Sequence, residues 1–146
     1  MAKQNILTKH INKNKKNMAT LNATLTLAST DASSDTLNLT VTDSLTIGPP
    51  STGVSQTACE ASTGSVISLK PTGSANQYTY IKHTGYQTDG STATTNQLVV
   101  KFGTTESLRL AAGEFAFFPT KSDAVVNAIS SSSHTILIEH GYWTAA

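Results

Sequence analysis

The segments LNATLTL (residues 21–27) and LNLTVTDSLTI (residues 37–47) alternate apolar and polar residues, with Asp43 as the one charged interruption. A period of two residues places successive side chains on opposite faces of a β-strand. Each segment therefore predicts a half-buried strand with one apolar and one polar face. The threonines favour the same structure, because a side chain branched at Cβ packs well on a pleated surface. The turn-forming cluster Asp31-Ala-Ser-Ser-Asp35 separates the two segments.

The remainder of the chain reads as short candidate strands separated by turn residues. The segment GPPSTG (residues 48–53) predicts the end of the second strand, because proline has no N–H to donate. Gly85, Gly103 and Pro119 predict further breaks. The candidate strands are residues 55–60, 65–69, 77–82, 98–102, 107–110, 114–118, 124–129 and 135–139. Strand starts about 8–12 residues apart, with no 3.6-residue period, predict an all-β antiparallel sandwich that is jelly-roll-like.

Charge divides the chain into a basic arm and an acidic body. Residues 1–17 (MAKQNILTKHINKNKKN) contain five of the ten Lys and Arg residues and none of the nine Asp and Glu residues. The rest of the chain keeps five cations and nine anions, a formal charge of −4. We therefore expect an extended N-terminal arm at residues 1–17 and one β-sandwich domain at residues 18–146. A body of about 130 residues is long enough for a single core.

The lysines of the arm have three interpretations. They could contact nucleic-acid phosphates, which would give a salt-sensitive and unspecific attachment. They could bind an acidic protein neighbour, with the arm folding on binding. The segment could also be a solvated tail or an upstream extension of the reading frame, since the strand pattern begins directly after Met18. We favour a protein partner over nucleic acid, and assign its binding to Lys3, Lys9, Lys13, Lys15 and Lys16.

Residues that could perform catalysis or bind a metal form no recognisable motif. The sequence contains no phosphate-binding loop, no GxSxG elbow and no paired-cysteine motif, and its single cysteine, Cys59, predicts a small packed side chain. Glu114 predicts a turn or strand-edge carboxylate, because general acid catalysis needs a second positioned group. We expect no enzyme activity, no catalytic residues, no metal and no cofactor. No apolar stretch approaches the roughly 20 residues that cross a bilayer, so we expect no membrane partner.

The four histidines are candidate metal ligands, but their spacing does not favour a shared metal ion. They are His10, His83, His134 and His140. His134 and His140 share parity on the last predicted strand and would lie about 20 Å apart. One zinc ion cannot use both, because its bonds to nitrogen are about 2 Å long. A metal site would need His83 and a carboxylate, Glu114 or Glu139, to converge on one of them. We expect instead that the histidines lie at strand ends or on a polar face.

The aromatic residues offer a possible binding surface. They are Tyr78, Tyr80, Tyr86, Phe102, Phe115, Phe117, Phe118, Tyr142 and Trp143. Such residues can stack on the bases of a nucleic acid, but phosphate binding demands a basic groove and the body is acidic. Tyr78 and Tyr80 share one face of a predicted strand, as do Phe115 and Phe117. This arrangement is typical of packing in a core or an interface.

Residues 77–142 resemble small structural proteins of tailed phages. The stretch LRLAAGEFAFFP (residues 108–119) is similar to a strand start that these proteins carry, apolar-x-x-Gly-Glu-apolar. The stretch TILIEHGY (residues 135–142) is similar to their final strand, which ends near Glu-x-Gly-Tyr/Phe, and residues 124–129 precede it as in these proteins. The segment YTYIKHTG (residues 78–85) is similar to their middle strand and turn.

The resemblance implies a β-sandwich protein of the virion, of the kind that includes capsid decoration (cement) proteins. It implies binding to the major capsid protein on the outer capsid surface, stabilisation of the shell, and a homo-oligomer, with a trimer as one form. Two alternatives stay open: a phage fibre or adhesion module that binds a host surface, and a cupin-like metalloenzyme. Cupins share the jelly roll, but Lys121 stands where their second motif has the glycine that follows Pro119, and the sequence has no His-x-His pair.

Overall fold

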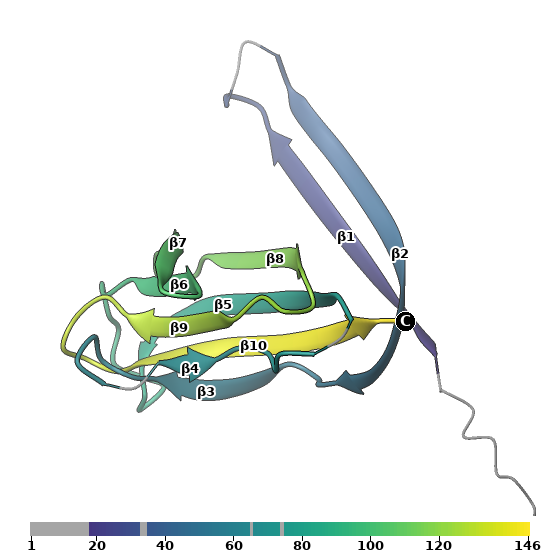
Figure 1. Ribbon diagram of the computed structural model, residues 1–146. Coiled ribbons are helices and arrows are strands. Elements are labelled where there is room, and N and C mark those ends of the chain that lie inside the picture. The colour runs from purple at the N-terminus through teal and green to yellow at the C-terminus, as the bar shows by residue number, and fades with distance from the viewer. Residues whose placement is uncertain (1–17, 33–34, 65, 74) are drawn as a thin grey trace, which may run out of the picture.

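The computed structural model describes residues 18–32, 35–64, 66–73 and 75–146, and their regular structure is entirely β-strand (Figure 1). The strands are β1 (Ala19–Ser29), β2 (Leu37–Ser51), β3 (Ser55–Cys59), β4 (Ile67–Ser68), β5 (Gln77–Gln87), β6 (Leu98–Phe102), β7 (Thr105–Leu110), β8 (Phe115–Thr120), β9 (Val126–Ser130) and β10 (Ile136–Ala145). The all-β prediction is confirmed. The basic arm, with its five lysines, lies outside the described residues.

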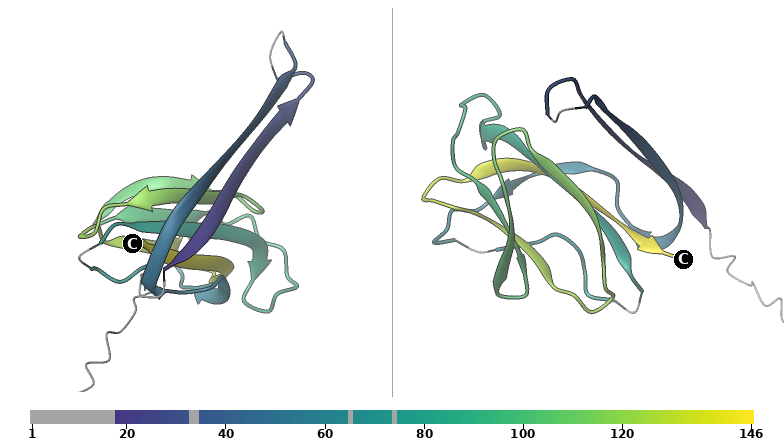
Figure 2. Two further views of the ribbon diagram at one scale, coloured as in Figure 1. Left: turned by 90° about the vertical axis from the view of Figure 1, so that its right-hand side faces the viewer. Right: turned by 90° about the horizontal axis from the view of Figure 1, so that it is seen from above.

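The strands form two packed antiparallel sheets (Figures 1 and 2). One sheet, called sheet A, has the order β1-β2-β10-β5-β8, and β3 also pairs with β10. The other, sheet B, has the order β4-β9-β6-β7. The four strands β3-β10-β5-β8 thus face the four strands β4-β9-β6-β7. Eight strands in two such sheets are the arrangement of a jelly roll, which confirms the predicted sandwich.

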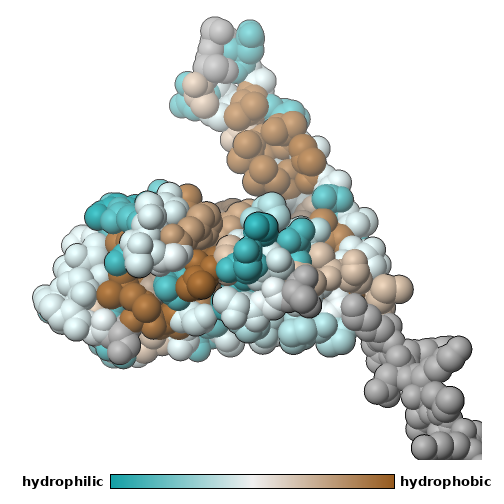
Figure 3. Space-filling model, in the orientation of Figure 1, coloured by the Kyte–Doolittle hydropathy of each residue, from teal (hydrophilic) through white to brown (hydrophobic). Residues whose placement is uncertain are grey.

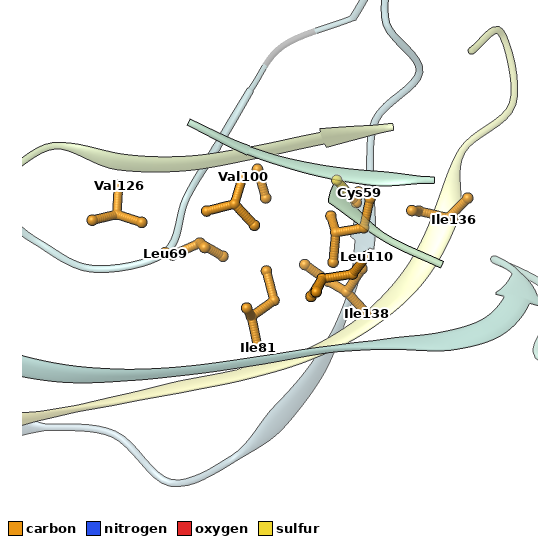
Figure 4. Close-up of a cluster of buried hydrophobic side chains, with 10 residues drawn as sticks. Cys59, Leu69, Ile81, Val100, Leu110, Val126, Ile136 and Ile138 are labelled. Carbon is orange, nitrogen blue, oxygen red and sulfur yellow. The ribbon is translucent and has the colours of Figure 1, made fainter. Parts of the chain in front are cut away.

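The hydrophobic core lies between these two sets of four strands (Figure 4). Ile81 on β5 and Ile138 on β10 point from sheet A toward sheet B, to which Val100 on β6 belongs, and all three are fully buried. The other buried members are Cys59, Leu69, Leu98, Leu110, Val126, Ala128 and Ile136. Cys59 is packed as predicted, and desolvation by burial, with a smaller effect of Glu60, raises the pKa of its thiol to about 12. The thiol therefore stays protonated near neutral pH.

Strands β1 and β2 form a long hairpin that projects from one end of the sandwich (Figures 1 and 2). They pair in one unbroken register, from Ala19 opposite Ile47 to Ser29 opposite Leu37. Only the base of the hairpin joins the sandwich, where β2 pairs with the end of β10. The prediction of two strands here is confirmed, but the prediction that they are half-buried is wrong for most of their length. The hairpin extends past the sheets, and no other described segment covers it.

Two of the breaks expected at prolines lie inside strands. β2 continues through Pro49 and Pro50 to Ser51, because these residues form a bulge: Thr144 of β10 pairs with Gly48, and Trp143 pairs with Ser51. A bulge leaves residues unpaired, so the missing N–H groups cost nothing there. Pro119 lies within β8, an edge strand of sheet A. One side of β8 has no partner strand among the described residues, so a residue that lacks an N–H group is tolerated there.

The break expected at Gly85 is also a bulge within a longer strand. β5 runs to Gln87, and its pairing with β10 shifts between Ile138, which faces His83, and Ile136, which faces Gln87. Gly85 has a φ of +92°, a conformation that side chains with a Cβ rarely adopt. The glycine therefore bends the strand instead of ending it.

Candidate protein-binding surfaces

One face of the β1–β2 hairpin is polar, and its side chains bond to one another across the two strands. The Oγ1 atoms of Thr24 and Thr42 lie 3.0 Å apart. The Ser44 hydroxyl donates to Asn22 Oδ1 at 2.9 Å. Short polar residues that face each other in this way satisfy part of their hydrogen-bonding capacity without a partner protein. This face needs no covering.

The opposite face of the hairpin is apolar and exposed (Figure 3). Its side chains form the leucine face, which we define as Leu25, Leu27, Leu37, Leu39 and Val41. The register pairs Leu25 with Val41 and Leu27 with Leu39, so these side chains form one continuous patch. Each member is between 39% and 52% exposed. The only charge on this face within the paired strands is Asp43, opposite Ala23 nearer the base.

A second exposed apolar surface lies on the outer face of sheet A. We call it the aromatic strip: Tyr78, Tyr80, Phe115, Phe117 and Trp143. The rings of Tyr78 and Phe117 are stacked, with centroids 6.2 Å apart and an interplanar angle of 11°. Trp143 lies 6.3 Å from Phe117, and Tyr80 lies 6.5 Å from Phe115. Phe115 is 58% exposed, so these rings lie outside the core, although the sequence favoured a core or an interface equally.

The leucine face and the aromatic strip lie on the same side of sheet A. Trp143 belongs to the strip, and Ala145, two residues later on β10, shares its face because strand side chains alternate. Ala145 pairs with Ile47, which has the same parity on β2 as Val41 and Leu39. The two surfaces therefore form one apolar side of the protein that runs from the hairpin onto the sandwich.

The charged groups beside the aromatic strip are weakly paired. Lys82 Nζ lies 3.9 Å from Glu139 Oε2, and both side chains are partly exposed. Burial, together with the nearby charge of Glu139, raises the pKa of Tyr80 above its usual value. An exposed ion pair of this kind contributes at most about 1 kcal/mol to stability. These charges border the strip without filling it.

His83 is fully buried, which corrects the expectation that the histidines lie at strand ends or on a polar face. The backbone N–H of Gly85 donates to Nδ1 at 2.9 Å. Because Nδ1 accepts, the proton lies on Nε2, which donates to the backbone oxygen of Asn96 at 2.8 Å. Both ring nitrogens therefore hold the β5 bulge against the loop before β6. Neither has a lone pair left for a metal ion.

The other two described histidines lie in different settings and do not converge. His134 precedes β10 and is exposed, so it does not share a strand with His140 as the sequence predicted. His140 is half-buried on the inner face of β10, and burial lowers its pKa. Glu114 is a turn carboxylate as predicted, since its Oε2 accepts the backbone N–H of Ala111 at 2.7 Å. Within the described part of the chain, no three His, Cys, Asp or Glu residues are grouped so that they could hold a metal.

The interior near the hairpin base is polar, a feature that the sequence analysis missed. The Gln77 amide donates to Thr144 Oγ1 at 3.4 Å, and the Thr120 hydroxyl donates to the backbone oxygen of Gln77 at 3.0 Å. Thr79 is fully buried, and its hydroxyl has no hydrogen-bond partner among the described residues. The alternation QYTY at residues 77–80 contained the signal, because it places Gln77 and Thr79 on the face opposite the tyrosines.

No protein-family model matches the sequence, and no curated protein matches it. The described residues contain no helix that is long and apolar enough to span a membrane. The two exposed apolar surfaces are thus the features of the structure that bear most directly on function.

Proposed function

We propose that this protein is a structural component of a phage virion that binds the outer surface of the capsid and stabilises the shell. The observation that supports the proposal is the exposed apolar side formed by the leucine face and the aromatic strip, which indicates a protein that works in an assembly, among further copies of itself or other proteins. Only 13% of the residues are charged, so little of the remaining surface is suited to polyanions. Large exposed apolar patches mark surfaces that bind other proteins. The resemblance of residues 77–142 to phage structural proteins supplies the partner, the major capsid protein.

The mechanism of stabilisation follows from mass action. A protein that binds the assembled shell but not the free subunits stabilises the shell by an amount that increases with its concentration above the dissociation constant. The jelly roll provides a rigid body, and the basic arm provides an attachment to an acidic surface of the lattice. Attachment through Lys3, Lys9, Lys13, Lys15 and Lys16 would weaken as salt is added.

The test is binding of the purified protein to emptied capsids of the source phage. We expect the protein to sediment with the shells and to raise the temperature at which they open. Absence of the protein from purified virions, or no binding to emptied shells, would contradict the proposal.

A chain that begins at Met18 tests the role of the arm in this binding. We expect it to show the same unfolding transition as the full chain and to bind shells at least about tenfold more weakly. A second variant keeps the full length and replaces the five arm lysines with glutamine, which separates charge from contact area. Its control replaces Lys101 and Lys121 of the body, neither of which is buried, with glutamine. Unchanged shell binding by the shortened chain would exclude the arm as the tether.

Exposed aromatic rings also favour a second function, that of a fibre or adhesion module. Stacked rings such as those of Tyr78 and Phe117 can bind the apolar faces of sugars on a host surface. Binding to a glycan array, or localisation to the phage tail, would support this function. Replacement of Trp143 with alanine would then abolish glycan binding, whereas Ser107→Ala, on sheet B, would not.

A further inference from the structure

The leucine face is an apolar surface that the described chain leaves uncovered. Its five side chains each expose about 80 Å², roughly 400 Å² in total, which equals the largest apolar patch of an ordinary monomer. The patch stands on a projecting hairpin instead of lying over the core (Figures 1 and 3). β1 is also the edge strand of sheet A, with one row of backbone groups unpaired by the described residues. An open apolar edge of this length promotes association.

The chemistry of the hairpin narrows the choice of partner. Asp43 is the only charged residue in the paired strands, so the hairpin offers no cation to a nucleic acid or to an anionic lipid surface. Leu25, Leu39 and their neighbours can lose contact with water only against another apolar surface. The aromatic strip is such a surface, and it belongs to the same chain.

The hairpin of one copy does not cover the strip of the same copy. The two surfaces lie on the same side of sheet A by register, but the hairpin projects away from the sandwich (Figures 1 and 2), and Leu39 and Phe115 both remain exposed. A second copy related to the first by a twofold axis would place its hairpin over the first strip and receive the first hairpin on its own strip. The two surfaces together expose roughly 800 Å² per copy, which is the area that each partner buries in a standard stable interface.

We propose that the leucine face of one copy packs against the aromatic strip of a second copy, so that exchanged hairpins build a closed homo-oligomer. The interaction pairs the flexible aliphatic side chains of Leu25, Leu27 and Leu39 with the rigid rings of Phe115 and Phe117. Rigid aromatic anchors in a desolvated centre are typical of the residues that dominate binding energy. The proposal identifies the surface behind the expected homo-oligomer, and it does not require that the protein binds a capsid.

The test is the molar mass of the full chain in solution, measured by sedimentation velocity and light scattering between about 1 and 100 µM. We expect an oligomer for the natural chain and a dissociation constant at least about a hundredfold higher for Leu39→Lys, which places a charge in the apolar contact. The matched control is Thr40→Lys. It adds the same charge to the adjacent residue on the polar face, and we expect less than about a threefold change.

A second pair of variants tests the strip. Phe117→Lys should weaken the oligomer as Leu39→Lys does, whereas Ser107→Lys, on an exposed position of sheet B, should not. Mixing Leu39→Lys with Phe117→Lys should restore part of the association, because one of the two contacts then joins an intact hairpin to an intact strip. Near-ultraviolet circular dichroism confirms that each variant is folded, since none of the substituted side chains belongs to the core.

Several outcomes would overturn the proposal. A natural chain that is monomeric at about 100 µM would exclude it at ordinary affinities. Loss of association in Leu39→Lys but not in Phe117→Lys would show that hairpins pair with hairpins. A monomer that floats with phosphatidylcholine vesicles would identify the leucine face as a membrane contact. Because none of these measurements includes a capsid, their failure is distinguishable from failure of the proposed function.

Discussion

Replacement of the buried histidine, His83→Leu, should destabilise the sandwich without affecting any binding surface. His83 is fully buried on the inner face of β5, and each of its ring nitrogens has a backbone partner. Leucine fills a similar volume but can neither donate nor accept. The substitution therefore leaves the Gly85 N–H and the Asn96 carbonyl without their partner.

The expected loss in the free energy of unfolding follows from the two backbone groups that lose their hydrogen-bond partner. A buried polar group that loses its partner costs about 1–3 kcal/mol, and we take about 1.5 kcal/mol for each because Gly85 and Asn96 are only half-buried. The apolar leucine offsets up to about 1 kcal/mol by its own burial. The net loss is about 2 kcal/mol, a substantial fraction of the 5–15 kcal/mol that stabilises an ordinary domain. It corresponds to a decrease of about 8 °C in the midpoint of thermal unfolding.

Urea unfolding followed by circular dichroism measures this loss. His83→Gln should be intermediate, because its amide nitrogen can still donate to Asn96 while the Gly85 N–H loses its acceptor. His134→Gln, at the exposed turn before β10, is the control and should change stability by less than about 0.5 kcal/mol. A His83→Leu protein as stable as the natural one would refute the structural role. Stabilisation of the natural chain, but not of His83→Leu, by equimolar Zn²⁺ would instead assign the histidine to a metal site.

Two further predictions concern the polar interior. Thr79→Val removes a buried hydroxyl without a protein partner and keeps the branched shape, so it should raise the free energy of unfolding by about 1 kcal/mol in urea titrations; a decrease would show that the hydroxyl is satisfied by water. Burial lowers the pKa of His140, so the unfolded chain binds its proton more readily than the folded chain. Stability should therefore fall as the pH drops below about 6.5, and His140→Gln should flatten this dependence; an unchanged slope would contradict the assignment.

The strands of the sandwich could be predicted because their alternation is local. β6 has the bounds Leu98–Phe102 in both the sequence analysis and the structure. The errors occur where tertiary context decides whether a strand ends. Gly85 forms a bulge opposite β10, and Pro119 lies on a free edge, but both look like breaks when the sequence is read alone. The pairing of β5 with β10 and β8 determines whether a strand ends at such a residue or continues through it.

The exposure of the hairpin could not be predicted from the same pattern. Alternation shows that the two faces of a strand differ, but it does not show whether another element covers the apolar face. Length gave no signal for β1, since it has 11 residues, as β5 of the sandwich does. Only β2, with 15 residues, is longer than every strand of the sandwich. For a related reason the sequence left the aromatic strip open between a core and an interface, since paired rings on one strand face are compatible with both.

The members of the hydrophobic core show which parts of the chain the core depends on. Every member of the core cluster comes from β3 or from a later segment, so the sandwich closes its core without β1 and with only the end of β2. The leucine face, in contrast, is left exposed by the described chain. A monomer would keep an apolar, open-edged hairpin in water, which is a hazard that natural sheet proteins avoid. The core cluster of the sandwich is therefore complete without the hairpin, and the leucine face is the part whose burial would require the proposed second copy.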